Sequence, residues 1–392
     1  MSATQRVWGA RRAVVIARIW ARAFWLALVV YRNPLRAAIA LRRVRAERKK
    51  SQRWAAQKYL YSSRRRQYFW DLYAPGWPSV AFDRYVLREL DRVDPISGRP
   101  PALQTVIIAI STRCALKCEH CFEWEALDHH ERQPANALME IVRRVQKRGV
   151  AKLFFSGGEP LQRFDDLLAL TATASSETDV WILSSGLGLT AEKARRLEGA
   201  GLTGIALSLD HWDASAHDQF RGLRGSFDAV VRAAANAREA ELLVALSLCP
   251  TRAFVSVENL EKYAETARNV GASFIQIVEP KPVGHYAGLD VALAPAQRRL
   301  LEQFHERMNC DPAARDLPAV EYPDWSARTF GCHGGDRYIY IDTDGALHPC
   351  PFCRTPGVPL LAHDTNEALA MVQTAGCRAA SCAIALPLPG RT

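Results

Sequence analysis

The sequence is poor in cysteine, with ten in 392 residues, which excludes a fold held together by a dense set of disulfides. Eight of the ten nevertheless fall into tight groups near positions 114–121, 332–353 and 377–382. Grouped cysteines of this kind indicate metal binding in a reducing compartment. Cys249 and Cys310 stand alone, and we interpret them as small buried hydrophobic side chains.

The sequence also lacks a long apolar run without charges. Residues 14–31 are apolar, but Arg18 and Arg22 interrupt them, and the uncharged stretch 23–31 is far shorter than the roughly 20 residues that span a bilayer. A transmembrane helix is therefore not expected. Arg11 lies on the same helical face as the other two arginines, and apolar side chains fill the rest, so the pattern predicts an interfacial helix.

Acidic residues are almost absent from residues 1–70, which hold 18 Lys and Arg and the single acid Glu47. The rest of the chain carries a net charge of −7, so any partner that binds through positive charge meets the N-terminal arm. A second helix is predicted to begin there, with Asn33 as its cap and Pro34 in its first turn. The alternative from another class is a non-catalytic, metal-stabilised protein that binds nucleic acid through this arm. The acidic body argues against it, and we expect no nucleic-acid partner.

Two interpretations of the basic arm, residues 1–60, stay open. Basic amphipathic helices bind the headgroups of anionic membranes, where each basic residue contributes about 1 kcal/mol. The arm would then attach the protein peripherally to the inner face of the cytoplasmic membrane. Alternatively, the arm packs against the body or against a partner protein. Residues 61–102, rich in aromatic side chains and proline, predict a connector between the arm and the body.

From Leu103 onward, short apolar runs alternate with amphipathic helical patterns. This alternation predicts a parallel α/β sheet, either doubly wound or curled into a partial barrel, with ligands at the carboxyl ends of the strands. The expected strands are 105–111, 152–156, 180–184, 204–209, 242–248 and 274–278, and the expected helices are 135–148, 163–175, 190–200, 226–240 and 257–270.

A cysteine motif follows the first expected strand. Cys114, Cys118 and Cys121 form the pattern C-x3-C-x2-C. Three thiolates on one short loop are able to hold three irons of a [4Fe–4S] cluster and leave the fourth iron open. The alternative is a structural zinc site, in which His120 supplies the fourth ligand.

A glycine motif follows the second expected strand. Gly157 and Gly158 allow a ligand to approach the backbone closely, and Glu159 is able to accept hydrogen bonds from an ammonium group. Together, the cysteine and glycine motifs resemble the radical S-adenosylmethionine (SAM) superfamily over residues 103–280. The resemblance implies a partial (β/α)6 parallel barrel, a SAM-binding catalytic [4Fe–4S] cluster, and an electron donor such as flavodoxin or ferredoxin.

The resemblance also implies further contacts with SAM. It places a small polar motif near the ribose, although Thr-Asn is more usual there than the two serines of this chain. Arg221 would pair with the SAM carboxylate in a bidentate fork; alternatively, it caps a helix or forms an ion pair with Asp218. The other residues that the resemblance brings to SAM are Ser184, Ser185, Ser208 and Asp210.

Five cysteines lie beyond the expected barrel. The sequence between Tyr338 and Cys350 predicts a hairpin with a glycine turn, which brings Cys332 and Cys350 together. Cys332, Gly345 and Cys350 give the pattern C-x12-G-x4-C, which resembles the opening of the SPASM and twitch extensions that hold auxiliary [4Fe–4S] clusters. The full SPASM array is not intact. The five cysteines suffice for one cluster, and zinc is the alternative metal. The candidate ligands are Cys332, Cys350, Cys353, Cys377 and Cys382.

The resemblance implies an enzyme that cleaves SAM reductively to a 5′-deoxyadenosyl radical, which abstracts hydrogen from a substrate. SPASM-like extensions accompany peptide or protein substrates, so we expect a cytoplasmic maturase. The basic arm leaves open a membrane-associated enzyme that modifies a lipid, quinone or other apolar metabolite. The expected organisation is an arm at 1–60, a connector at 61–102, a radical SAM core at 103–285, a linker helix region at 286–328 and a Cys-rich hairpin and helix extension at 329–392.

Overall fold

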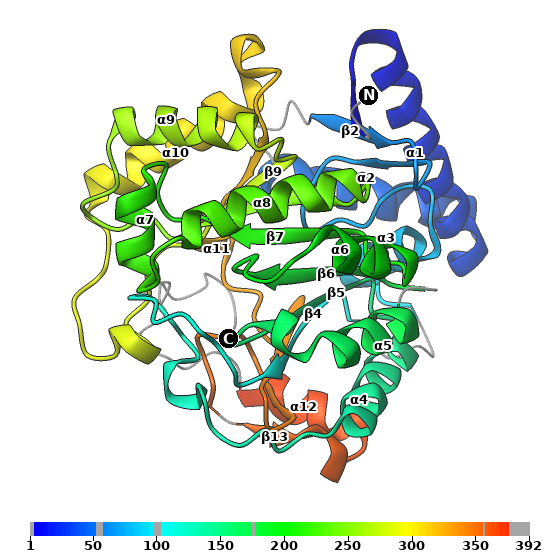
Figure 1. The fold of residues 1–392 in the computed structure, drawn as a ribbon. Helices are drawn as coiled ribbons and strands as arrows, with labels where there is room; N and C mark the ends of the chain where they lie inside the picture. Colours follow the sequence, from blue (N-terminus) through cyan, green and yellow to red (C-terminus); the bar gives the residue numbers. More distant parts are fainter. Residues whose placement is uncertain (1–3, 52–57, 97–102, 175–176, 356, 376–392) are drawn as a thin grey trace.

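The protein is described here from a computed structural model, which covers residues 4–51, 58–96, 103–174, 177–355 and 357–375 (Figure 1). Its central feature is a ten-stranded sheet in the order β10-β9-β8-β7-β6-β5-β4-β11-β12-β13. Every pair from β10 to β11 is parallel, and the last two pairs are antiparallel. The strands are β4 (Thr105–Ser111), β5 (Lys152–Gly157), β6 (Asp179–Ser184), β7 (Gly204–Ser208), β8 (Leu243–Leu248), β9 (Phe274–Ile277), β10 (Ala319–Glu321), β11 (Tyr338–Ile341), β12 (Ala346–His348) and β13 (Val358–Pro359).

The predicted alternation of strands and helices is confirmed. Each of the six expected strands lies within one residue of its predicted bounds, and the five expected helices connect them. The structure adds one parallel strand at each end of this set, β10 beside β9 and β11 beside β4. The connecting helices are α4 (Ala135–Lys147), α5 (Phe164–Ala174), α6 (Ala191–Gly199), α7 (Ala214–Arg221), α8 (Ser226–Glu239) and α9 (Val257–Asn269).

Alternate residues of each strand point to opposite faces of the sheet. Leu153 and Phe155 of β5 belong to the apolar core formed with the connecting helices. Phe154 lies between them and packs on the other face with Trp181 and Phe274. Both faces are therefore covered, as a parallel sheet requires.

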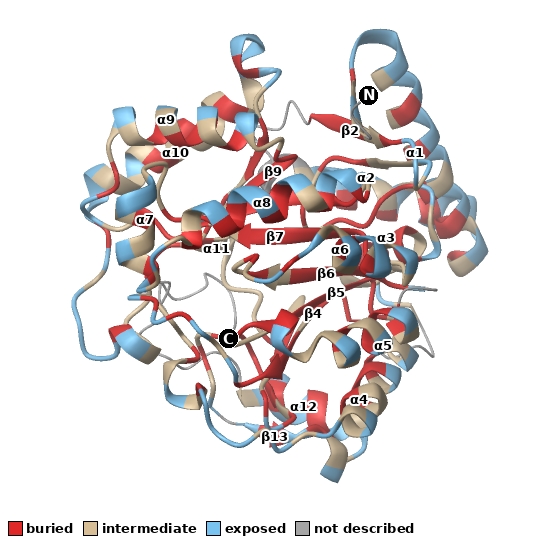
Figure 2. Cartoon of the chain, viewed as in Figure 1, coloured by how far each residue is buried: buried red, intermediate tan, exposed pale blue. Residues whose placement is uncertain are grey.

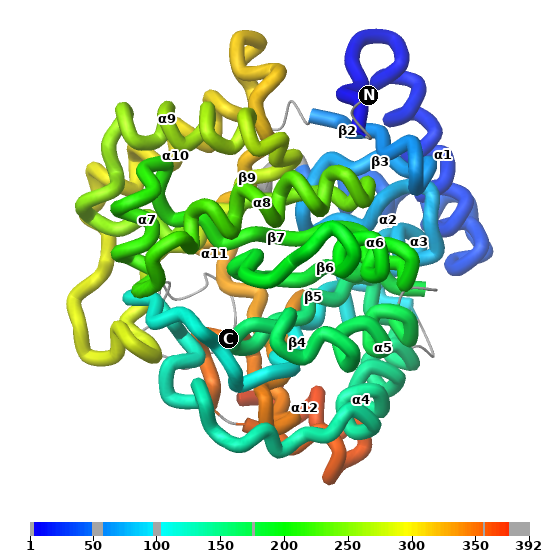
Figure 3. The backbone as a smooth tube through the Cα atoms, in the orientation of Figure 1, coloured from blue at the N-terminus to red at the C-terminus, as the bar shows by residue number. Residues whose placement is uncertain are grey.

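The other face is closed by an N-terminal module made of β1 (Thr4–Val7), α1 (Gly9–Tyr31), α2 (Pro34–Ser51), β2 (Tyr59–Ser62), β3 (Gln67–Phe69) and α3 (Val80–Val93). The three strands form a separate antiparallel sheet. Leu60, Phe69 and Leu72 insert into the apolar cluster around Phe154. Figure 3 shows the module gathered on one side of the molecule.

The module also covers the amino ends of the strands. Arg65 donates hydrogen bonds to the carbonyls of Gly201 and Leu202, which precede β7, and Arg84 donates to the carbonyl of Glu177, which precedes β6. The carboxyl ends of the strands are left for the site. The boundary predicted between residues 60 and 61 falls inside β2, so the structure joins the predicted arm and connector in one packed unit.

Helix α1 has one face packed against the module. The buried residues of this face are Val15, Ile19, Ala23, Leu26, Ala27 and Tyr31. The Arg22 guanidinium binds the Asp83 carboxylate on α3, with an Nε to Oδ1 distance of 3.0 Å. Among the described residues, α1 is long and apolar enough to cross a membrane, judged by length and composition alone. Asn33 caps α2 as predicted, because its Oδ1 accepts the Arg36 amide at 3.0 Å.

The region predicted as a linker, residues 286–328, contains a sheet strand, β10, as well as helices. The 3-10 helix at Gly284–Tyr286 crosses its first boundary, and α11 crosses its last. The remaining helices are α10 (Pro295–Cys310), α11 (Pro323–Phe330) and α12 (Thr365–Ala375), with short 3-10 helices at Trp124–Ala126, Pro160–Arg163, Gly284–Tyr286, Pro312–Ala314 and Leu360–Ala362.

The packing of the module leads to a stability prediction. Phe82 on α3 is 1% exposed and meets Trp70 edge to face, so Phe82→Ala is expected to lower the free energy of unfolding by about 3–5 kcal/mol. Val80 on the same helix is 53% exposed, and Val80→Ala is expected to change it by less than about 0.5 kcal/mol. Urea unfolding of the two variants measures the difference. Equal midpoints would contradict the packed module.

Candidate functional site

The cysteine motif lies on the loop that follows β4. The amides of Lys117 and Glu119 donate to the carbonyls of Arg221 and Phe220 at the end of α7, both at 3.0 Å. The thiols of Cys114, Cys118 and Cys121 all line one cavity of about 590 Å³. This volume is in the range of small-molecule sites. The loop therefore presents all three predicted cluster ligands to the same space.

Burial makes these thiols poor candidates for isolated thiolates. It raises the pKa of Cys114 to about 11 and the pKa of Cys121 to about 12. It also raises the pKa of Cys118, although Arg221 opposes this shift. Coordination to a cationic metal centre deprotonates even such thiols, so the donor set fits an iron–sulfur cluster.

Among the described residues, no three His, Cys, Asp or Glu side chains form a group that could hold one metal ion. A cubane cluster does not require such a group, because each of its thiolates binds a different iron.

The two glycines of the second motif bring β5 against the cysteine loop. A Cβ on Gly157 would lie 2.4 Å from the Ser111 carbonyl oxygen, and one on Gly158 would lie 2.5 Å from that of Arg113. The amides of Gly158 and Glu159 donate to these same carbonyls at 2.6 and 2.7 Å. The close approach that the glycines allow in the structure is therefore to the backbone of the cysteine loop.

Glu159 is 1% exposed and joins the ends of β5 and β6. Its Oε1 accepts from the Ser184 hydroxyl at 2.7 Å and from the Leu161 amide at 3.1 Å. Its Oε2 accepts from the amide and hydroxyl of Ser185, at 2.8 and 2.5 Å. Burial raises the pKa of the Glu159 carboxyl, and the hydrogen bonds from Ser185 and Ser184 oppose the shift. Glu159 thus fixes both serines while lining the cavity.

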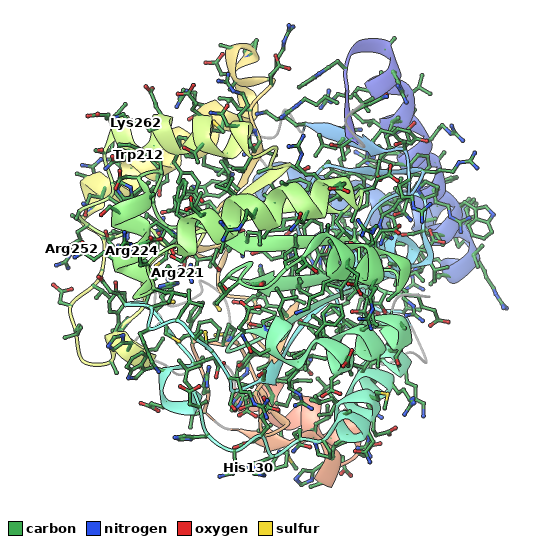
Figure 4. The ribbon with its side chains drawn as sticks, viewed as in Figure 1. His130, Trp212, Arg221, Arg224, Arg252 and Lys262 are labelled. Atoms are coloured by element: carbon green, nitrogen blue, oxygen red, sulfur yellow. The ribbon has the colours of Figure 1, made fainter. Side chains whose placement is uncertain are left out.

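Asp210 and Arg221 form a buried ion pair next to the cysteine loop. Nε and Nη2 of Arg221 lie 2.6 and 2.5 Å from Oδ2 of Asp210, and Nη1 lies 3.5 Å from Sγ of Cys118. Burial is the largest influence and would raise the pKa of Asp210, but the charges of Arg221 and two histidines and the hydrogen bond from the Cys249 amide together lower that pKa. Figure 4 labels Arg221 at the end of α7. The arginine binds Asp210 rather than Asp218, whose carboxylate accepts hydrogen bonds at the start of α8.

A ring of inward polar residues forms one part of the cavity wall. Each stands two positions after an inward apolar residue, at the carboxyl end of its strand, and the ring consists of Ser156, Ser185, Ser208, Ser247 and Gln276. Gln276 donates to the hydroxyl of Tyr73 from the N-terminal module. Our sequence analysis did not assign Ser247, Gln276 or Tyr73 to the site. For Ser247 and Gln276, the signal was the alternation of inward and outward side chains every two residues along a strand.

Two of the C-terminal cysteines line the same cavity. These are Cys332 and Cys350, which both lie close to Gly334. A Cβ on Gly334 would lie 3.5 Å from Sγ of Cys332 and 3.4 Å from Cβ of Cys350. Cys353 forms an isolated antiparallel bridge with Cys350. The predicted hairpin is present and brings these cysteines together, whereas Cys377 and Cys382 lie outside the described residues.

Glu123 connects the two cysteine regions. It is 3% exposed, lies two residues after Cys121, and accepts hydrogen bonds from Tyr340 on β11 and from Arg354. The Arg354 Nη2 to Glu123 Oε1 distance is 2.5 Å. No local pattern predicts this contact, because the partners of Glu123 lie more than 200 residues away. The C-terminal extension is thereby held against the cysteine loop.

Comparisons with known proteins agree with this arrangement. The model of the family described as "Radical SAM superfamily" matches residues 108–270. An AdoMet-dependent heme synthase of Nitratidesulfovibrio vulgaris is 27% identical over 285 residues, which cover 64% of this chain and 74% of that protein. A PqqA peptide cyclase of Granulibacter bethesdensis is 28% identical over 264 residues, covering 64% and 68%.

Among solved structures, Streptococcus suis SuiB bound to the precursor peptide SuiA has a similar fold. Its TM-score to this chain is 0.58, with 17% sequence identity, over 72% of this chain and 69% of that one.

The buried ion pair leads to a second prediction. Asp210→Asn and Arg221→Met should each destabilise the protein by about 3–5 kcal/mol, because each leaves an uncompensated buried charge. The double variant should lose at least about 1 kcal/mol less than the sum of the two. Arg224→Met, at an exposed position three residues on, should stay within about 0.5 kcal/mol of the wild type. Anaerobic denaturant unfolding gives these values, and additive losses would show that the pair is not formed.

Proposed function

We propose that the chain is an enzyme of the radical SAM superfamily, which its similarity to that family over residues 108–270 supports, and that it is a maturase that modifies a peptide or protein. The observation that carries this proposal is that three thiols of one loop share a cavity with Glu159, the strand-end serines and two C-terminal cysteines. One cavity thus holds the donors for a cluster, a polar wall for SAM and a second cysteine group.

The proposed catalytic cluster is a [4Fe–4S] centre on Cys114, Cys118 and Cys121. When bound, it supplies the electron that splits SAM into methionine and a 5′-deoxyadenosyl radical. The residues of the chain bind and orient SAM and shield the site from water. The ring of strand-end residues, with Ser185 and Ser208, provides hydroxyl groups toward SAM, and the closed amino end of the sheet limits the access of water.

Arg221 has a specific part in this proposal. Two of its nitrogens are bound to Asp210, and Nη1 points at the sulfur of Cys118. A hydrogen bond to a ligand sulfur tunes a cluster's reduction potential. We therefore assign Arg221 a positioning role at the cluster, in place of the free bidentate fork toward the SAM carboxylate. Asp210 holds its guanidinium.

A peptide or protein substrate is supported by two of the similar proteins. One is named for cyclising the PqqA peptide, and the other was crystallised with the precursor peptide SuiA. The C-terminal cysteine group supports an auxiliary [4Fe–4S] cluster that faces the substrate, because Cys332 and Cys350 line the same cavity as the catalytic loop. Reduced flavodoxin or ferredoxin is the electron donor we expect.

A second candidate substrate is an apolar metabolite such as a lipid or a quinone. The observation in its favour is the exposed apolar surface of α1. Mass analysis of the products separates the two candidates. If the substrate is a peptide, its mass changes by the modification, and a lipid extract incubated with the enzyme yields no modified product.

Reciprocal cysteine variants test the assignment of the two sites. After anaerobic reconstitution, Cys118→Ala should form no detectable 5′-deoxyadenosine and should retain the iron of the C-terminal group. Cys350→Ala should lose C-terminal iron and still form 5′-deoxyadenosine. Chromatography with mass detection and iron analysis measure both.

The matched control is Cys310→Ala, at the end of α10 and outside the cavity lining, which should keep the iron content and the cleavage of the wild type. SAM cleavage by Cys118→Ala at the wild-type rate would overturn the assignment of the catalytic loop.

A further inference from the structure

The exposed surface of α1 carries large apolar side chains along its length, with the exposed residues Arg11 and Arg18 among them. The exposed apolar side chains continue across the turn into α2 and have between 37% and 68% of their surface accessible: Val14, Phe24, Trp25, Val29, Leu35 and Ile39. Figure 2 shows exposed residues along the outer side of α1. We call these six residues the outer face. A row of this length is unusual on a protein that remains fully in water.

The helix is nevertheless fixed to the protein. Its inner side belongs to the buried cluster of the N-terminal module. The Tyr31 hydroxyl donates to the carbonyls of Leu90 and Asp94 at the carboxyl end of α3, at 3.1 and 2.7 Å. A helix that crossed a bilayer would have to break these contacts and the Arg22–Asp83 pair. The outer face is thus presented by a helix that lies along the body.

Positive charge surrounds the outer face. The nearby acids on and beside α3 already have arginine partners, since Asp83 binds Arg22 and Asp94 binds Arg36. The other exposed arginines of α1, α2 and the turn between them are Arg11, Arg18, Arg32, Arg42, Arg43 and Arg45. Glu47 is the single acid in residues 1–70. The surface therefore complements an anionic partner.

Trp25 stands at the border between the apolar and the basic parts. The Arg22 guanidinium lies 4.3 Å from the centroid of its ring. Tryptophan with a neighbouring cation is typical of side chains that settle at the headgroup level of a membrane. An acidic protein groove would match the charge, but exposed apolar side chains with arginines among them along one helix fit a planar headgroup surface better.

We propose that the outer face binds the surface of an anionic lipid bilayer, with α1 lying in the plane of the interface. The apolar side chains enter the boundary between headgroups and acyl chains, and the arginines bind the lipid phosphates. This docking is independent of the chemistry in the cavity, since none of the six residues lines it.

Co-sedimentation with vesicles tests the proposal. The full-length reconstituted protein should bind vesicles of phosphatidylcholine mixed with phosphatidylglycerol and should not bind phosphatidylcholine alone. Raising the salt concentration should weaken the binding, because it screens the arginines. Trp25→Ser combined with Val29→Ser should weaken binding at least about tenfold, since both side chains lose their apolar contact with lipid.

Val231→Ser combined with Val257→Ser is the matched control, because both valines are exposed on α8 and α9, away from α1. This variant should bind as the wild type does. Both double variants should unfold at the wild-type midpoint and form 5′-deoxyadenosine equally, which separates loss of docking from loss of fold.

Three outcomes would overturn the proposal. The first is the absence of binding to anionic vesicles, and the second is equal binding by the two double variants. The third is a dimer in sedimentation velocity that Trp25→Ser with Val29→Ser dissociates while vesicles recruit neither form, because the outer face would then bind a second copy of the chain.

Discussion

The site depends on the contact between two backbones, the start of the cysteine loop and the turn after β5. The amides of Gly158 and Glu159 donate to the carbonyls of Ser111 and Arg113. The space between the two backbones leaves no room for a Cβ on Gly157 or Gly158. This pairing extends the β4–β5 register beyond the sheet, so the thiols and the Glu159 carboxylate keep a fixed relation. Glu159 then connects this contact to Ser184 and Ser185 through three of its four hydrogen bonds, and the fourth comes from the Leu161 amide. The cysteine loop, the turn of Gly157 and Gly158, and the two serines are thus connected in one unit.

Much of the core could be predicted because its signals are local. The strands of a buried parallel sheet are short continuous apolar runs, and the helices between them repeat their apolar positions every three to four residues. The three-cysteine loop and the Asn33 cap are likewise read from neighbouring residues. The strand-end ring was predicted only in part, although the two-residue period that places Ser247 and Gln276 in the cavity is equally local.

The remainder depends on contacts between distant parts of the chain. The pattern of α1 indicates an amphipathic helix but not which surface covers each side, and only the fold shows that Val15 is buried while Val14 is exposed. The pairing of β10 with β9, through a strand of three residues, is set by its neighbour. The same holds for Glu123, whose partners Tyr340 and Arg354 come from the C-terminal extension. Arg221 was predicted to reach SAM, yet Asp210, eleven residues before it, binds its guanidinium.

The central claim is that the loop of Cys114, Cys118 and Cys121 holds a cluster with one iron open to SAM. The most direct measurement is the electron paramagnetic resonance spectrum of the anaerobically reduced protein with and without SAM, taken on Cys350→Ala so that the C-terminal group contributes no signal. The account predicts a reduced [4Fe–4S] signal whose g values shift when SAM binds. A signal that SAM leaves unchanged, from a protein with full iron content in the loop, would contradict it.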